Sequence, residues 1–331
     1  MTHPKLVTRF TRGLGMILLV LQAIATTESA AEGQDFPNHP IRIVVPAAPG
    51  GALDTISRLL AHKVSELSNQ QIYIENKPGA NWTIGMDAVA KAAPDGYTLL
   101  MVPPAVAANA TLYQHLNFNF LHDIAPIAGV VRVPNVVEVN PSVPVKTIPE
   151  LIAYAKANPG KLSFASAGIG TASHLAGQLF NTMTGANLQH VPYRGDGPAM
   201  ADLIAGQVQV GFATMTASIG HIRAGQLRPL AVTTIKRSDA LPGIPSVSDF
   251  LPGYEASSWF GIAAPQGTPP EIIESLNRET NAGLADSTID ARLADMGGML
   301  LTGSPADFGR LIADETQKWS KVIREAGIKA E

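Results

Sequence analysis

The chain alternates, almost from end to end, between short apolar runs and stretches in which apolar residues recur at helical spacing. The apolar run at 41–45 precedes a helical pattern over 55–67, the run at 72–75 precedes a helical pattern over 84–93, and 97–102 is again a strand-like run. Strands that alternate with helices in this way form sheets covered by helices. The sequence therefore predicts an α/β fold with mainly parallel sheets.

A second series of the same kind follows. Its expected strands are 162–165, 188–193, 208–212 and 227–232, and its expected helices are 149–158, 172–183, 198–205 and 218–224. Helix start signals stand at Thr147 with Glu150, at Thr268 with Pro269, and at Ser304. Ser and Thr at these positions accept hydrogen bonds from the first helical turn.

A chain of 331 residues has the length of two domains. No flexible linker separates two halves, so the extended stretches 130–140 and 254–264 are the expected crossings. Two crossings make one domain discontinuous. We expect residues 32–133 with 256–331 in the first domain and 134–255 in the second.

The N-terminus has the layout of a secretory signal. Lys5, Arg9 and Arg12 precede an apolar run over 13–25, and small residues precede an expected cleavage near Ala31. The alternative is a membrane anchor, but a spanning helix needs about 20 apolar residues and this run is shorter. The expected location of the mature protein, residues 32–331, is the periplasm.

Composition excludes several classes of function. The net charge is −3, and removing residues 1–31 takes away three cations and one anion, so the mature chain is more acidic. Without Lys/Arg clusters, nucleic acid is not an expected partner. The chain has no cysteine and no pair of histidines at ligand spacing, so neither a metal nor another cofactor is expected.

Three glycine-rich loops each join an expected strand to an expected helix. They span residues 46–54, 76–85 and 166–174. The first turn of a helix leaves N–H groups unpaired and carries about half a positive charge, so such a loop can hold an anion without Arg or Lys. In α/β sheets these loops gather at the carboxyl ends of the strands. The alternative for each loop is a plain connection.

An enzymatic interpretation of the same loops is weaker. The segment around Gly168 and Gly170 is an incomplete dinucleotide fingerprint, and the segment before Gly168 is an incomplete nucleophile elbow. Ser166 and His174, with Asp54 or Asp196 as the acid, are the only triad to consider. We expect no catalytic residue.

The order of several motifs along the chain is more specific. The sequence resembles the substrate-binding receptors of tripartite tricarboxylate transporters, also called Bug receptors. The matching segments are PIRIVVP at 40–46, PGG with Asp54, ENKPGA at 75–80, APDGYTL at 93–99, ANPGKL at 157–162, residues 168–177, VPYRG at 191–195, HIRAG at 221–225 and WFG at 259–261. Together they cover nearly the whole mature chain.

This resemblance implies a two-domain periplasmic-binding-protein (Venus flytrap) fold that closes on a small carboxylate and passes it to membrane permease subunits. The expected ligand contacts, carried over by position or drawn from the third loop, are Pro49, Gly50, Gly51, Asp54, Trp82, Thr83, Gly85, Ser166, Gly170, Thr171, His174 and Arg194. His174 either touches the ligand or only caps and packs. Arg194 either adds charge to the cleft or is a solvated loop residue.

Three segments of the sequence differ from the family pattern, and the differences bear on which ligand the protein binds. Trp82 stands where small residues are usual, residues 103–105 are less polar than usual, and the strand end 212–214 lacks an aspartate. A flat ligand would stack on the indole, so we expect an aromatic mono- or dicarboxylate such as a phthalate-type acid. The alternative is an aliphatic ligand with Trp82 packed on the domain surface. We expect a monomer, and a sensor subunit is the alternative to a transport receptor.

Overall fold

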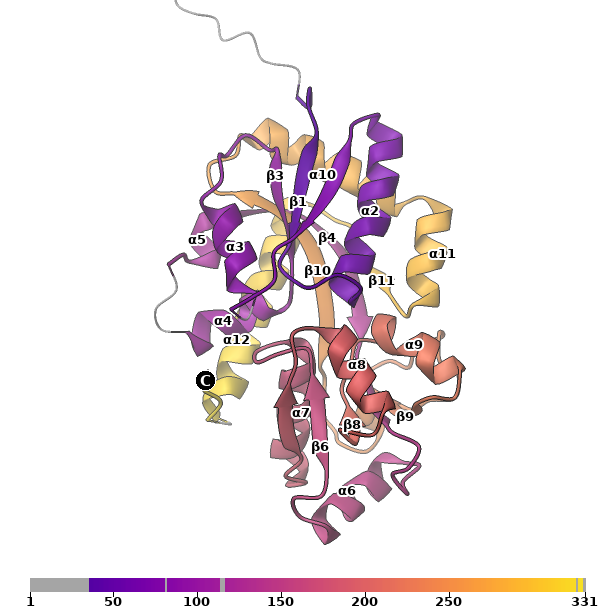
Figure 1. The fold of residues 1–331 in the computed structure, drawn as a ribbon. Coiled ribbons are helices and arrows are strands. Elements are labelled where there is room, and N and C mark those ends of the chain that lie inside the picture. Colours follow the sequence, from indigo (N-terminus) through magenta and orange to yellow (C-terminus); the bar gives the residue numbers. More distant parts are fainter. Residues whose placement is uncertain (1–35, 81, 114–116, 326, 330–331) are drawn as a thin grey trace, which may run out of the picture. The chain divides into compact units, whose positions relative to one another are not determined.

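The computed structural model describes residues 36–331, except 81, 114–116, 326, 330 and 331. The expected signal peptide lies outside this part of the chain. Residues 39–331 form one unit that contains two sheets with helices around them (Figure 1). The predicted α/β class is confirmed.

The first sheet has the strand order β11-β4-β10-β3-β1-β2 in the described residues. Its strands are β1 (Ile41–Val45), β2 (Ile72–Asn76), β3 (Thr98–Val102), β4 (Ile124–Pro134), β10 (Ser257–Pro265) and β11 (Met299–Leu300). Strand β1 is parallel to β2 and β3, whereas β10 is antiparallel to both β3 and β4. Only one half of this sheet is therefore parallel.

The second sheet has the strand order β7-β6-β8-β5-β9. Its strands are β5 (Val136–Val139), β6 (Ser163–Ser166), β7 (Gln189–Pro192), β8 (Val210–Gly211) and β9 (Arg228–Val232). Strand β6 is parallel to β7 and β8, but β5 is antiparallel to β8 and β9. The prediction of mainly parallel sheets is thus corrected to mixed sheets. The physical reason is that β5 and β10 enter directly from the other sheet, without a covering crossover helix.

The helices mostly agree with the predicted pattern. They are α2 (Ala52–Ser68), α3 (Thr83–Ala90), α4 (Ala105–Leu112), α5 (Phe120–Asp123), α6 (Ile148–Ala157), α7 (Ala172–Thr184), α8 (Asp196–Ile204), α9 (Met215–Arg223), α10 (Pro270–Leu284), α11 (Ser287–Asp295) and α12 (Pro305–Glu325), with a 3-10 turn η1 at Val247–Asp249. Thr147 caps α6 and Ser304 caps α12 as predicted. Helix α10 begins one residue later than predicted, with Pro269 rather than Thr268 at its N-cap.

Helix α4 was not predicted, because its sequence lacks a polar face. Its residues Ala105, Val106, Ala107, Ala108, Asn109 and Leu112 are all buried. A helix that is buried on every side has no amphipathic stripe for periodicity to detect. Helices α2 and α8 begin three and two residues earlier than predicted, and both early starts bear on the candidate site.

The chain changes sheet within the two segments expected as crossings. Only Asn135 separates β4 from β5, and β10 begins directly after Ala256. Asn135 N donates to Thr233 Oγ1 at 2.9 Å, Ala256 N donates to Thr233 O at 3.0 Å, and Ser258 Oγ donates to Asn135 Oδ1 at 2.9 Å. These bonds tie the two crossings together. The domain boundaries at 133/134 and 255/256 remain a prediction.

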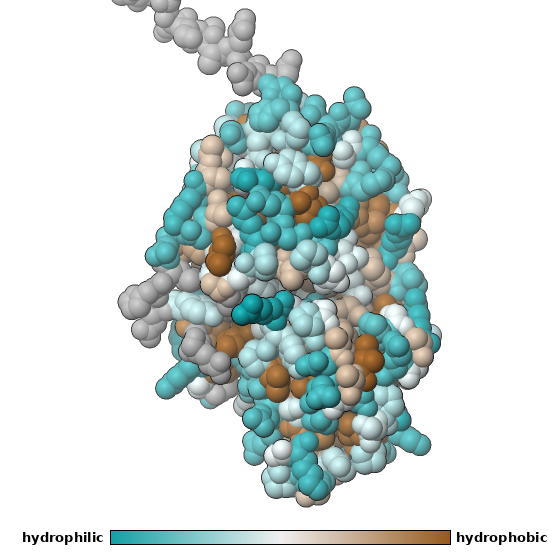
Figure 2. Space-filling model, viewed as in Figure 1, coloured by the Kyte–Doolittle hydropathy of each residue, from teal (hydrophilic) through white to brown (hydrophobic). Residues whose placement is uncertain are grey.

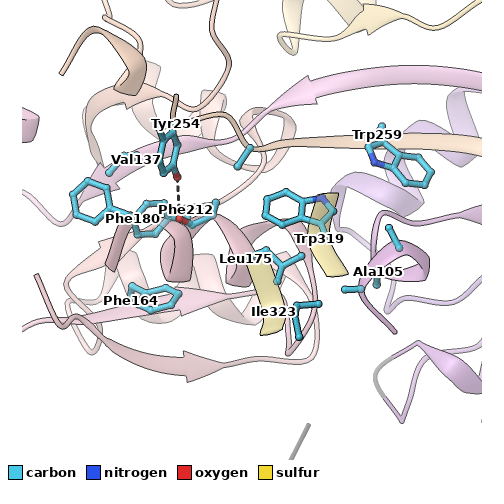
Figure 3. Packing of buried hydrophobic residues seen from close by; sticks show 14 of the residues in the cluster. Ala105, Val137, Phe164, Leu175, Phe180, Phe212, Tyr254, Trp259, Trp319 and Ile323 are labelled. Atoms are coloured by element: carbon cyan, nitrogen blue, oxygen red, sulfur yellow. Dashed lines mark hydrogen bonds between the residues drawn. The ribbon is translucent and has the colours of Figure 1, made fainter. Parts of the chain in front are cut away.

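A single cluster of buried apolar side chains runs past both sheets. Figure 3 shows Trp319 and Ile323 beside Leu175, with Trp259 on one side of them and the aromatic residues Phe212, Phe180 and Tyr254 on the other. The Tyr254 hydroxyl donates to Ala176 O at 2.9 Å inside this cluster. Helix α12 contacts both α4 and α7, so the C-terminal helix helps to join the two sheet regions.

The face of the molecule drawn in Figure 2 has a mixed surface. On the face drawn in Figure 2, hydrophobic residues are scattered among hydrophilic ones. Among the helices of the described residues, none has the length and apolar composition that a membrane span requires.

Close packing of β10 against α12 gives a testable prediction. A Cβ at Gly261 would overlap the Phe308 ring and lie 2.6 Å from Ala128 O. We expect Gly261→Ala to lower the free energy of unfolding by about 1–3 kcal/mol through overpacking. The matched control is Gly309→Ala in α12, where the nearest atom would be Pro126 Cγ at 3.6 Å. The control should gain up to about 1 kcal/mol from helix propensity. Equal urea midpoints for the two variants would contradict this packing.

Candidate functional site

The first glycine-rich loop ends in a helix whose N-cap residue is a glycine and so has no side chain to cap the first turn. Gly51 is the N-cap of α2, and the helix starts at Ala52. Behind the loop, the buried carboxylate of Asp54 accepts hydrogen bonds from Gly50 N at 3.0 Å and from Asn76 Nδ2 at 2.9 Å, and it pairs with Arg58. Burial opposes ionisation of Asp54, but these hydrogen bonds hold its pKa below the ordinary value. Asp54 therefore braces the loop.

The third loop is ordered by its own side chains. Gly170 has φ 74°, and its N–H donates to His174 Nδ1 at 3.0 Å. Thr171 is the N-cap of α7 and accepts from His174 N, while Ser173 Oγ accepts from Ala167 N at 2.9 Å. His174 thus supports the loop from inside, and it does not line the cavity described below.

Two buried histidines stack behind this loop. The His174 and His190 rings lie 4.0 Å apart, and Ser166 Oγ is 2.6 Å from His190 Nε2. Burial lowers the pKa of His174 to about 3 and that of His190 to about 4, with His190 adding to the shift of His174. Both imidazoles are therefore neutral at pH 7.

The triad considered from the sequence is not assembled in the described structure. Ser166 is 1% exposed, and its hydroxyl contacts His190 rather than His174. Asp54 is held by the first loop. Asp196 is the first residue of α8, and its carboxylate lies beside the start of α2, as shown below. Ser166 is also too deeply buried for a substrate to reach.

Trp82 is the residue that the second loop contributes to the cavity. It is the N-cap of α3 and has a left-handed backbone with φ 73°. Its neighbours in the prediction have packing roles: Thr83 Oγ1 donates to Ala80 O at 2.6 Å, and a Cβ on Gly85 would lie 2.7 Å from Pro46 Cβ. A non-glycine residue in this conformation costs about 1–2 kcal/mol, and such strain concentrates at functional sites.

All three loops meet at one cavity of about 30 Å³, which we call the inner cavity. The second sheet region adds the start of α8 and Thr214, and β10 adds Ser258 and Phe260. Its lining residues are Ala47, Ala48, Pro49, Gly51, Ala52, Leu53, Trp82, Pro104, Ala167, Thr171, Ala172, Ser173, Arg194, Gly195, Asp196, Gly197, Pro198, Thr214, Ser258 and Phe260. This volume holds about two water molecules. A larger ligand therefore requires the walls to separate.

Backbone N–H groups with no acceptor among the described residues line this cavity at the starts of α2, α7 and α8, and Gly197 is the example in α8. Gly51 and Leu53 lie at the start of α2, and Ala172 and Ser173 lie at the start of α7. The amides of Gly50, Gly170 and Thr171, which were also expected to face a ligand, are instead bound within the protein. Donors are therefore available at the helix starts, including Gly51, whereas the amides of Gly50 and Gly170 are not available to a ligand; anion binding by these donors stays a prediction.

A wider outer cavity of about 490 Å³ adjoins the inner one. Trp82 and Arg194 line both cavities, and Tyr113 and Tyr193 line the outer one. Arg194 is exposed, and its guanidinium has no hydrogen bond or ion pair within the described part of the chain. Arg194 thus lies at the junction of the two cavities, and its contribution of charge to the cleft stays a prediction.

Asp196 is the site residue that sequence reasoning missed as a ligand contact. Helix α8 starts at Asp196, not at Pro198, which turns its carboxylate toward the start of α2. The carboxylate accepts from Thr214 Oγ1 at 3.4 Å and from the backbone amide of Ala52. Burial raises the pKa of Asp196 to about 6 although both bonds oppose the shift. The available signal was an acidic residue next to a glycine at a helix start.

The described residues contain no group of three His, Asp or Glu side chains placed to hold a metal ion. The lining of the inner cavity supplies backbone amides, hydroxyls, the Asp196 carboxylate, the Arg194 guanidinium and an aromatic wall.

The left-handed backbone of Trp82 predicts the order of stability of two variants at this position. Both Trp82→Ala and Trp82→Gly remove the indole, but only glycine adopts φ 73° without strain. We expect Trp82→Gly to unfold with a free energy about 1 kcal/mol higher than Trp82→Ala, because alanine would carry the left-handed strain and glycine would not. Urea denaturation of the two variants measures the difference. A more stable alanine variant would show that the left-handed conformation is absent.

The buried histidine pair predicts sensitivity to acid. In the unfolded chain both imidazoles bind protons below about pH 6.5, but in the folded protein they do so only near pH 4 and 3. Folding stability from this pair is therefore complete above pH 6.5 and is lost as the pH falls toward 4. As the pH falls, we expect the free energy of unfolding to decline less steeply in His190→Gln than in the wild-type protein. In the exposed control His122→Gln the decline should match that of the wild-type protein. Parallel curves for all three proteins would contradict the buried pair.

Comparison with known proteins agrees with this geometry. The model of the tripartite tricarboxylate transporter family receptor matches residues 56–328. Protein BugT of Bordetella pertussis is 38% identical over 311 residues, which cover 92% of this chain and 95% of BugT.

Solved structures are similar over almost the same span. The structure of R. palustris Rpa4515 with adipate is 37% identical, has a TM-score of 0.87, and is matched over 89% of this chain and 99% of that chain. MatC from Rhodopseudomonas palustris with bound malate is 30% identical, has a TM-score of 0.83, and is matched over 87% and 100% of the two chains. The expected family resemblance is confirmed: this chain belongs to the tripartite tricarboxylate transporter receptor family.

Proposed function

We propose that the protein is an exported receptor that captures a small organic carboxylate and delivers it to membrane permease subunits without changing it chemically. The observation that carries this proposal is the set of four amides without acceptors at the starts of α2 and α7, which line one cavity. Carboxylates are stabilised at helix starts by unpaired N–H groups and by the helix dipole. The related structures with adipate and malate support a carboxylate ligand.

Capture requires a change in the cleft. The inner cavity of about 30 Å³ is too small for an organic acid of several carbon atoms. Its walls come from loops of both sheet regions, so separation of these regions opens it, and a bound ligand then stabilises the closed arrangement. The crossings at Asn135 and Ala256 are the places where such a motion would bend the chain. A closed receptor is the form that we propose docks on the permease.

We propose an aromatic ring for the ligand, in an aromatic mono- or dicarboxylate. Trp82 lines both cavities, and Tyr113 and Tyr193 extend the aromatic wall outward. The strain that Trp82 carries at φ 73° supports a role for its indole at this place. The lining of the inner cavity by Pro49, Pro104 and Phe260 adds apolar surface for a ring.

The test compares two ligands of similar size that differ in aromaticity. We expect benzoate to bind more tightly than cyclohexanecarboxylate in calorimetric titrations, by about two- to tenfold, the range of ring stacking. Trp82→Ala should remove most of this preference. The control Tyr73→Ala removes an aromatic residue of β2 that is 46% exposed and lines neither cavity, and it should keep the preference.

Two outcomes would overturn parts of this proposal. If succinate or citrate stabilised the protein and no aromatic acid did so, the aromatic ligand would be wrong while the receptor function would stand. If no carboxylate in a broad panel bound at all, the receptor function itself would be wrong.

A further inference from the structure

We propose that Asp196 determines the ligand class: the receptor takes a molecule with one carboxylate and, at its other end, a hydrogen-bond donor or a cation, in preference to a dicarboxylate. This inference deepens the proposed function and rests on it. The reason is that a carboxylate of the protein itself already occupies one of the two helix starts that face the cavity.

Asp196 reaches from the second sheet region to the first. It is the first residue of α8, and its Oδ2 would lie 3.8 Å from a Cβ on Gly51, the N-cap of α2. Its carboxylate accepts the backbone amide of Ala52 and the hydroxyl of Thr214. Figure 1 shows the first turn of α2 next to α8. The start of α2 is therefore already compensated by an anion.

The start of α7 differs from that of α2. The amides of Ala172 and Ser173 have no acceptor among the described residues, and the acidic side chains discussed above do not contact them. Because carboxylates repel each other at short range, a ligand carboxylate favours the α7 side over a position beside Asp196. One ligand carboxylate thus has a place, and a second would meet Asp196.

The charges around Asp196 point the same way. Arg194 lines both cavities and is the cation nearest in sequence. Glu138 on β5 is buried, hydrogen-bonded to Ser218 at 2.8 Å, and its pKa is raised to about 8 mainly by burial, so it is neutral at pH 7. Asp54 is held behind the first loop by Arg58. Asp196 therefore supplies the negative charge of the inner cavity, and the site as a whole is dipolar.

The experiment uses two pairs of ligands that differ only at one end. Terephthalate is compared with 4-aminobenzoate, and adipate with 6-aminohexanoate, by calorimetric titration at pH 7. We expect the amino member to bind the wild-type protein at least about tenfold more tightly than the dicarboxylate in the pair that fits the cavity. Asp196→Asn should shrink this ratio by about tenfold or more, by strengthening dicarboxylate binding. The control Asp239→Asn removes an exposed charge outside both cavities and should leave the ratio unchanged.

The outcomes separate this inference from the proposed function. If the wild-type protein bound the dicarboxylates as tightly as their amino counterparts, or if Asp196→Asn left the ratio unchanged, the role of Asp196 would be wrong while carboxylate binding would stand. If neither the wild-type protein nor Asp196→Asn bound any of the four or any carboxylate of the broad panel, the proposed function would fail, and this inference with it. Circular dichroism of each variant confirms that it is folded.

Discussion

The candidate site depends on backbone N–H groups that helices cannot satisfy by themselves. The first turns of α2, α7 and α8 meet at one cavity, and each brings unpaired donors and a positive dipole end. Such donors need an anion when they are shielded from water. Part of that need is met by Asp196 at the start of α2, and the rest is left to a ligand at Ala172 and Ser173.

The fold brings these helix starts together by keeping two sheets close through two crossings. Asn135 and Thr233 hydrogen-bond across the point where the chain changes sheet, and the apolar cluster continues from one sheet region to the other. The cavity lies between elements that belong to different sheets, so its size depends on how these elements are held. A small inner cavity that adjoins a larger outer one is compatible with a receptor that closes on its ligand.

Several residues that the sequence predicted to contact the ligand instead support the loops that line the cavity. Asp54 braces the first loop, Gly85 allows α3 to approach Pro46, and His174 holds the amide of Gly170. Their roles require knowledge of which groups lie within hydrogen-bonding distance, and spacing along the chain does not contain this information. Pro49, Gly51, Trp82, Thr171 and Arg194 do line the inner cavity.

The sequence by itself determined the α/β class, most strands and helices, the three loops and the family, because these follow from local periodicity, turn residues and ordered motifs. Tertiary structure decided the mixed strand directions, the buried helix α4 and the position of Asp196 against α2. The physical reason is that each of these depends on contacts between residues distant in the chain. Periodicity records which face of an element is buried, but not which other element covers it.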